Sequence, residues 1–137
     1  MKFEIINTKF KTISNKENPN SKPKKYDLEE RTFLFAKNVC ELAKNAPRTI
    51  ANFEYLRQVI RSSGSVGANY IEANESLGKK DFLMHIKICR KEAKESRFWL
   101  SLLQINEDDK SERIRNNLIQ EAIELMKIFS SIMRKSF

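Results

Sequence analysis

Apolar residues recur along residues 79–106 in a regular helical pattern. The positions of this apolar seam follow one another at spacings of 4, 3, 4, 3, 4 and 3, as Phe82, Ile86, Cys89, Ala93, Ser96, Leu100 and Leu103. Such spacing is typical of a helix in a bundle or coiled coil. The pattern therefore predicts a helix over residues 79–106, a rod about 40 Å long at about 1.5 Å per residue.

A second helix is expected near the N-terminal side of the chain. Asp27 and Glu30 have capping-box spacing, with Asp in place of Ser or Thr. Pro47 disfavours helical geometry in the residue before it, so the helix should end there. Its predicted apolar face consists of Leu28, Phe35, Val39, Leu42 and Ala46.

Two more stretches complete a set of four helices. One begins between Thr49 and Asn52 and runs to about Asn74; the other begins at Ser111 as N-cap and runs to about Arg134. The expected inner faces are Phe53, Leu56, Ile60, Ser63, Gly67, Tyr70 and Ile71 in the former, and Ile114, Leu118, Ala122, Leu125, Phe129 and Ile132 in the latter.

Small residues form the run RSSGSVG at positions 61–67, inside the helix that ends near Asn74. Gly64 and Gly67 each lower helix propensity by roughly 1 kcal/mol relative to Ala. A helix retains such residues where a neighbouring backbone comes close. A loop over residues 62–68 is the competing interpretation, and the apolar pattern that resumes at Tyr70 favours the helix.

Short connections between four long helices predict an all-α, antiparallel up-down-up-down four-helix bundle over residues 26–137. Residues 1–25 form a flexible basic N-terminal extension in this interpretation, because KENPNSKPKK is too polar to order itself. The alternative is a short arm at residues 3–13 that docks on a partner. No apolar run approaches the roughly 18 residues that a membrane helix needs, and no secretory signal is evident. We expect a cytoplasmic protein without membrane contact.

Residue types argue against catalysis. The single histidine, His85, lacks the Glu-x-x-His partner of a di-iron bundle, and we expect it at a solvent boundary instead of on a metal. Cys40 and Cys89 both fall in apolar patterns, where burial keeps a thiol unreactive. GxSxG is absent, and RSSGSVG lacks the ending of a phosphate-binding loop. We expect no enzyme activity, no metal and no cofactor.

Basic residues are the strongest candidate for a binding function. The net charge is +8, of which residues 1–26 supply +5 through seven Lys and two Glu. On the helix at 79–106 we assign a possible contact with RNA or DNA backbone to Lys80, Lys87, Arg90, Lys91, Lys94 and Arg97. The alternative is a solvated face, neutralised in part by Glu92 and Glu95 at i±3 and i±4.

Aromatic residues outside the expected inner faces indicate a second packing surface. Phe98 and Trp99 lie off the seam, and Phe33, Phe53 and Tyr55 lie partly off theirs. Several exposed aromatics on a small bundle favour a homo-oligomer. Cover by loops or by the N-terminal segment is the alternative.

The chain resembles the four helix bundle proteins encoded in intervening sequences of bacterial 23S rRNA genes. The pieces that carry the match are RSSGSVGANYIEAN at 61–74, KKDF at 79–82 and KEAKESRFWLSLL at 91–103. The matching positions are Arg61, Ser62, Ser65, Ala68, Asn69, Glu72, Phe82 and Glu95. The resemblance covers residues 25–136 and implies antiparallel bundles assembled as homopentameric rings. A related branch, the accessory proteins of diversity-generating retroelements, implies binding to nucleic acid and to a reverse transcriptase.

Shared polar residues suggest a structural role in the bundle. We expect Arg61, Asn69, Glu72, Glu92 and Glu95 to form a buried polar network that fixes the register between helices or subunits. A ligand site built from the same groups is the alternative. The sequence thus predicts a non-enzymatic oligomeric bundle that contacts RNA or an RNA-handling partner such as a reverse-transcriptase-like protein. A protein-interaction scaffold with no nucleic-acid role is the second interpretation.

Overall fold

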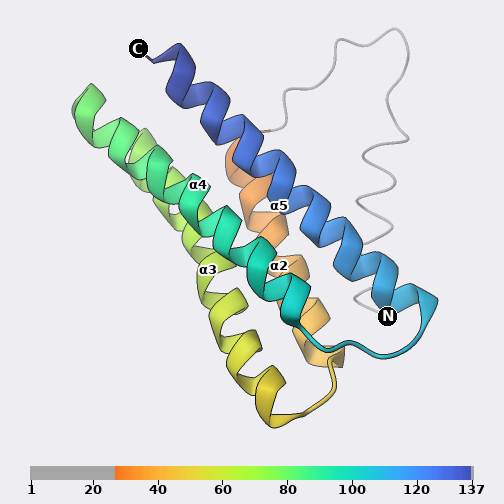
Figure 1. Ribbon diagram of the computed structural model, residues 1–137. Coiled ribbons are helices and arrows are strands. Elements are labelled where there is room, and N and C mark those ends of the chain that lie inside the picture. The colour runs from red at the N-terminus through yellow and green to blue at the C-terminus, as the bar shows by residue number, and fades with distance from the viewer. Residues whose placement is uncertain (1–26, 137) are drawn as a thin grey trace, which may run out of the picture.

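Four helices make up the part of the chain that the computed structural model describes, residues 27–136 (Figure 1). They are α2 (Leu28–Asn45), α3 (Ile50–Asn74), α4 (Lys79–Leu102) and α5 (Asp109–Lys135), and no strand occurs within this range. The predicted all-α fold with four helices is confirmed. The predicted N-terminal extension, with its alternative arm at residues 3–13, lies outside the described residues.

Side-chain caps explain where three of the helices begin. The Asp27 carboxylate accepts a hydrogen bond from Glu29 N at 3.0 Å, and Thr49 Oγ1 accepts one from Asn52 N at 3.1 Å. The expected cap of the last helix is wrong: Asp108 is the N-cap, and it accepts hydrogen bonds from the backbone and the side chain of Ser111. Aspartate is favoured at this N-cap position because its carboxylate accepts both hydrogen bonds and interacts favourably with the helix dipole.

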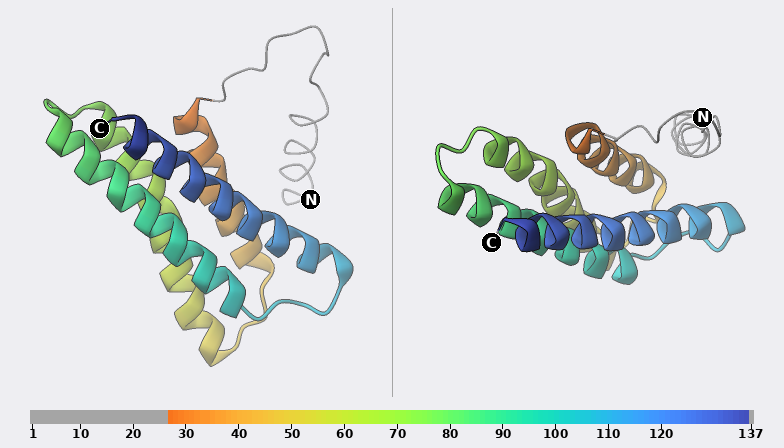
Figure 2. Two further views of the ribbon diagram at one scale, coloured as in Figure 1. Left: turned by 45° about the horizontal axis from the view of Figure 1, so that its top comes forward. Right: turned by 90° about the horizontal axis from the view of Figure 1, so that it is seen from above.

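The helices pack in the cyclic order α2, α3, α4 and α5, so that α2 and α4 lie at opposite corners (Figure 2). Among these four neighbouring pairs, the contact between α3 and α4 is the most extensive and that between α2 and α5 the least. Along α3 and α4 the contacts run in opposite order, as Tyr55 meets Trp99 and Asn69 meets His85. The core is built from Phe35, Val39, Leu42, Val59, Val66, Ile86, Ala93, Leu100, Leu118, Leu125 and Phe129.

The small-residue run is helical throughout, so the alternative of a loop at 62–68 is wrong. The inner face expected for α3 is also partly wrong. Phe53, Ile60 and Ile71 are exposed, whereas Val59 and Val66 are fully buried. Two apolar stripes run along α3, and the stripe covered by the other helices is the one with the smaller β-branched and hydroxyl side chains.

Helix α4 ends at Leu102, four residues earlier than expected. The buried side chain of Asn52 holds the chain that follows: its Nδ2 donates to Gln104 O and its Oδ1 accepts from Gln104 N, both at 2.8 Å. The same Nδ2 donates to Pro47 O at 2.8 Å. Asn52 therefore ties the α2–α3 and α4–α5 connections together at one end of the bundle.

Candidate nucleic-acid interface

Helix α4 separates an apolar face from a basic one. Ile86, Cys89, Ala93 and Leu100 are fully buried in the bundle. The candidate basic residues lie outside this buried face: Lys80, Lys87, Lys91, Lys94 and Arg97 are exposed and Arg90 is half-buried. They share the outer side of α4 with the exposed Met84, Phe98 and Leu102. The helix thus carries a row of cations on a rigid support whose other side is fixed in the core.

The acidic residues of α4 form no ion pair with this row among the described residues. Glu92 is nearly buried and its Oε2 lies 3.5 Å from Arg61 Nη1, while Glu95 Oε2 lies 3.0 Å from Arg61 Nη2. Both carboxylates are therefore directed toward α3. The alternative of i±3 and i±4 pairs along α4 is wrong, because no ion pair joins Glu92 or Glu95 to a lysine among the described residues.

Helix α5 extends the basic face. Arg90 Nη1 lies 3.5 Å from Ser130 Oγ, which places this part of α4 directly beside α5. Lys127 and Arg134 lie three residues before and four residues after Ser130, so they flank it on the same side of α5. Both are exposed. The sequence analysis did not include these two residues. Their spacing of three and four residues from Ser130 indicates a shared face only once the contact between Arg90 and Ser130 is known.

The expected polar network is only partly assembled. Arg61, Glu92 and Glu95 come together as described, but Asn69 donates to Ser65 O at 2.9 Å and contacts His85 Nδ1 at 3.3 Å. Glu72 is exposed and forms no ion pair within residues 27–136. The single histidine lies at a boundary, with its Nε2 3.5 Å from Asp81.

A buried hydroxyl pair between α3 and α4 was not anticipated. Ser62 Oγ and Ser96 Oγ are 2.8 Å apart, both side chains are fully buried, and Ser96 Oγ also donates to Glu92 O at 2.8 Å. Because each buried hydroxyl has a hydrogen-bond partner, the cost of removing it from water is offset. Their role here is structural.

The two cysteines differ in exposure, and only Cys89 is buried. Burial raises the pKa of the Cys89 thiol to about 12, and its Sγ donates to Val66 O at 3.3 Å. The expectation for Cys40 is wrong, because this side chain is exposed on α2. Within residues 27–136 no three His, Cys, Asp or Glu side chains gather closely enough to hold a metal ion.

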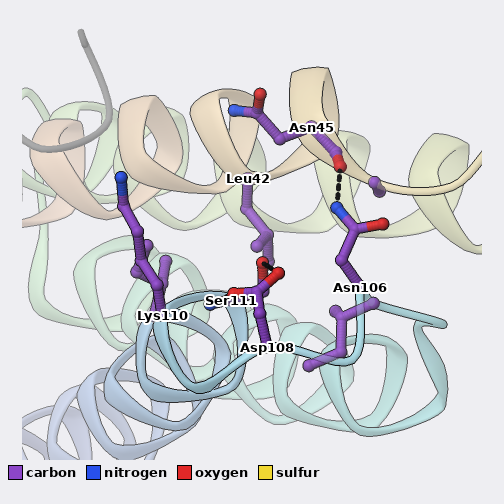
Figure 3. A pocket seen from close by; sticks show the side chains of 9 residues that line it. Leu42, Asn45, Asn106, Asp108, Lys110 and Ser111 are labelled. Carbon is purple, nitrogen blue, oxygen red and sulfur yellow. Dashed lines mark hydrogen bonds between the residues drawn. The ribbon is translucent and has the colours of Figure 1, made fainter.

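A pocket of about 300 Å³ opens where the end of α2 meets the start of α5 (Figure 3). Its polar lining maintains the fold: Asn106 Nδ2 donates to Asn45 O at 2.9 Å, and Asp108 caps α5 through Ser111. Leu42 and Ile114 supply an apolar floor. Asn106 and Asp108 thus hold the α4–α5 connection in place. The basic residues of α4 and α5 remain the candidate binding surface.

The arrangement defines an all-helical protein of four packed helices, two of which carry exposed basic residues. The chain belongs to the family of 23S rRNA-intervening sequence proteins, whose sequence model matches residues 24–131. The predicted resemblance is thereby confirmed. None of the helices within residues 27–136 is long and apolar enough to cross a membrane.

A solved relative has the same fold. The chain is similar to a protein of unknown function from the S23 ribosomal protein family of Bacteroides thetaiotaomicron, known from a crystal structure, with 28% sequence identity and a TM-score of 0.67. The match covers 77% of this chain and 97% of that chain. Among curated proteins, none matches this chain.

Proposed function

We propose that this protein is a non-enzymatic homo-oligomer of antiparallel bundles that contacts RNA phosphates through the basic face of α4 and α5. The observation that carries the proposal is the direction of Glu92 and Glu95, which pair with Arg61 of α3. The exposed lysines of α4 therefore have no ion pair with any residue in the range 27–136. Unpaired cations on a rigid helix are available to phosphate oxygens.

The contact would be electrostatic and independent of base sequence. Lysines bind phosphates as point charges and carry no information on base sequence. Binding energy would come from released counterions, so affinity should fall steeply with salt. The N-terminal segment, with its net charge of +5, would add to the same attraction.

Assembly would strengthen such a contact. In the expected homopentameric ring each copy presents the same basic face, and several weak contacts on one RNA add up through effective concentration. A protein-interaction scaffold is the second candidate, with a reverse-transcriptase-like or other protein as its partner. Three exposed aromatic side chains favour the scaffold, because they offer apolar contact area to a protein partner: Phe33, Phe53 and Phe98.

The test is fluorescence anisotropy of labelled RNA titrated with the full chain over a salt series. We expect log affinity to fall linearly with log salt concentration. The double variant Lys87→Glu/Lys94→Glu should weaken binding and lower the salt slope by about 1–2, at about 0.7–0.9 per lost phosphate contact. The matched control Lys37→Glu/Arg48→Glu makes the same charge change on α2 and in the α2–α3 connection, and it should have a much smaller effect.

Equal losses in the two double variants would show that only net charge matters and would reject the assigned face. A chain without residues 1–24 separates the tail from the bundle, since loss of all affinity with the tail would also reject the face. Absence of binding at low salt would leave the scaffold as the function. Labelled DNA in parallel shows whether the 2′-hydroxyl contributes.

A further inference from the structure

The contact between α2 and α5 is the least extensive of the four neighbouring pairs, and polar side chains line it. Arg31 of α2 pairs with α5, since its Nη2 lies 2.6 Å from Glu121 Oε1, and Asn45 lines the pocket at the start of α5. Residues between these two, at spacings of three and four, lie on the same side of α2. We define the α2–α5 seam by residues of the two facing rows: Leu34, Asn38 and Glu41 of α2, with Glu121, Glu124 and Ile128 of α5.

The seam contains a buried acceptor without a donor. Asn38 is 5% exposed, and its Oδ1 has no hydrogen-bond partner among the described residues. Buried polar atoms are nearly always paired, because an unpaired one loses its hydrogen bonds to water without replacement. Glu41, one turn further along α2, is also buried. The α2 side of the seam is thus closed to water, although α3, α4 and α5 supply no donor to Asn38 Oδ1.

Apolar side chains on the seam lie outside the core. Leu34 and Ile128 are half-buried, and neither is among the side chains that pack on the core cluster of residues 27–136. The pocket of about 300 Å³, with Leu42 and Ile114 in its lining, continues the seam where α2 ends. The seam therefore offers apolar contact area to a further segment.

Negative charge is in excess where the seam meets the start of α2. Arg31 Nη2 is shared between Glu121 Oε1 at 2.6 Å and Glu124 Oε2 at 3.3 Å, and the Glu124 side chain is 50% exposed. Residues 1–26 carry a net charge of +5 and join the bundle at the same end, before Asp27 at the N-cap of α2. The chain therefore tethers a basic segment beside an exposed carboxylate.

Residues 3–13, FEIINTKFKTI, have the sequence pattern of a short amphipathic helix. Large apolar residues recur at spacings of three, four and three, as Phe3, Ile6, Phe10 and Ile13. Lysines recur every seven residues beside them, as Lys2, Lys9 and Lys16. Residues 14–26 can span up to about 43 Å when extended. Helix α2, with 18 residues, is about 27 Å long. The segment can therefore reach any part of the seam.

We propose that residues 3–13 dock on the α2–α5 seam of their own chain as an amphipathic helix. Its apolar side covers Leu34 and Ile128, its lysines lie against Glu124, and one of its side-chain donors reaches Asn38 Oδ1. A short tether gives such a segment a high effective concentration at its own chain, so that modest contacts hold it. The docking surface is separate from the exposed lysines of α4, and the inference needs neither RNA nor an oligomer.

Zero-length carbodiimide cross-linking of the full chain, read by mass spectrometry, tests the contact directly. An amide forms only where a lysine amine meets a carboxylate, and we expect links from the lysines of residues 2–16 to Glu124. Glu54, exposed on α3 at the corner opposite α5, is the control carboxylate and should stay unlinked. Unlabelled and ¹⁵N-labelled chains are unfolded and refolded together before the reaction. Links within one chain then carry a single isotope at both ends.

Hydrogen exchange tests which side of the segment makes the contact. In the full chain the amides of residues 3–13 should exchange at least about tenfold more slowly than in an unstructured peptide. Phe3→Asp/Phe10→Asp should abolish this protection, because it removes two apolar anchors. The matched control Thr8→Asp/Thr12→Asp makes the same charge change on the opposite side of the predicted helix and should keep most of the protection.

On the bundle side, Glu124→Lys should lower the protection of residues 3–13, whereas Glu54→Lys should leave it unchanged. Both positions are exposed, so circular dichroism should retain the signal of the four helices. Equal protection in the two double variants would overturn the inference, as would a full chain without protection or links to Glu54 as frequent as those to Glu124. Links of mixed isotope only would overturn docking on the same chain.

Discussion

Gly67 of α3 lies so close to Thr32 of α2 that a Cβ at position 67 would stand 3.1 Å from Thr32 Oγ1. Thr32 is 1% exposed, and its hydroxyl donates to Glu29 O at 3.1 Å. The threonine therefore has little freedom to move aside. This contact is the physical reason for one of the two glycines in the small-residue run, and it sets the spacing between α2 and α3.

Gly67→Ala should consequently gain nothing from its better helix propensity, which would otherwise add about 0.5–1 kcal/mol. In a Thr32→Ala background, where the hydroxyl is gone, the same substitution should recover that gain. A double-mutant cycle by urea unfolding should give a coupling free energy of about 1 kcal/mol. Additive effects of the two substitutions would show that the contact imposes no constraint.

Asn52 should be among the most sensitive positions of the bundle. Its fully buried side chain makes three hydrogen bonds of 2.8 Å to Pro47 and Gln104. Asn52→Ala removes the partner of three backbone groups that are only partly buried, so each should cost toward the lower end of the about 1–3 kcal/mol of a buried unsatisfied group. We expect a loss of about 3 kcal/mol or more in the free energy of unfolding. The control Asn116→Ala, at an exposed position on α5, should change it by less than about 0.5 kcal/mol.

Helix ends were largely predictable because their signals are local. Asp27, Thr49 and Pro47 act within a few residues of their own position, and α2 and α3 begin and end near the expected residues. The buried face of α3 was not predictable in the same way. Phe53, Ile60 and Ile71 form as regular an apolar stripe as Val59 and Val66, and only the positions of α2 and α4 decide which stripe is covered.

The candidate site, too, was predictable from local sequence only in part. The spacing of Lys87, Lys91 and Lys94 placed them on one side of a helix, as the structure has them. The partner of Glu92 and Glu95 depended on the register between α3 and α4, which the sequence does not specify. The hydrogen bond between buried Ser62 and Ser96 was not predicted, because a polar residue type indicates exposure unless its hydrogen-bond partner is known.

Arg61→Ala should destabilise the protein more than Glu95→Ala. Glu92 is 8% exposed, and Arg61 is its ion-pair partner, so removal of Arg61 leaves a nearly buried carboxylate unpaired. The Arg61–Glu95 pair is solvent-exposed and contributes about 0–1 kcal/mol. We expect a loss of about 1–2 kcal/mol for Arg61→Ala, discounted from the fully buried case because Arg61 is 54% exposed. Thermal melts of both variants and of Arg61→Ala/Glu92→Gln check this ranking, since the double variant should recover part of the loss.

Cys89 should be inert toward thiol reagents in the folded protein. Burial raises the pKa of its thiol to about 12, so the thiolate is nearly absent at pH 8. In a Cys40→Ser variant, which leaves this thiol alone, a chromogenic disulfide reagent should show no reaction until urea unfolds the chain. Rapid reaction of the folded variant would show that the α3–α4 contact opens far more often than its packing indicates.

The N-cap of α5 should make stability depend on pH in a defined direction. The backbone N–H of Ser111 donates to the Asp108 carboxylate and lowers the pKa of Asp108 below its ordinary 3.8. A carboxyl whose pKa is lower in the folded than in the unfolded chain stabilises the fold fully above the unfolded value. That contribution is lost as the pH falls through the folded pKa.

The melting temperature of Asp108→Ala should therefore lie below that of the unaltered chain at pH 6. The charge-dependent part of the difference should shrink as the pH drops below 3.8. Asp108→Asn keeps a capping oxygen without the charge and should show a smaller, nearly pH-independent difference. Glu107→Ala, one residue earlier and without a hydrogen bond to α5, controls for loss of a negative charge in this loop. A difference for Asp108→Ala that stays constant from pH 6 to pH 2.5 would assign the cap to hydrogen bonding alone and remove the electrostatic part of the argument.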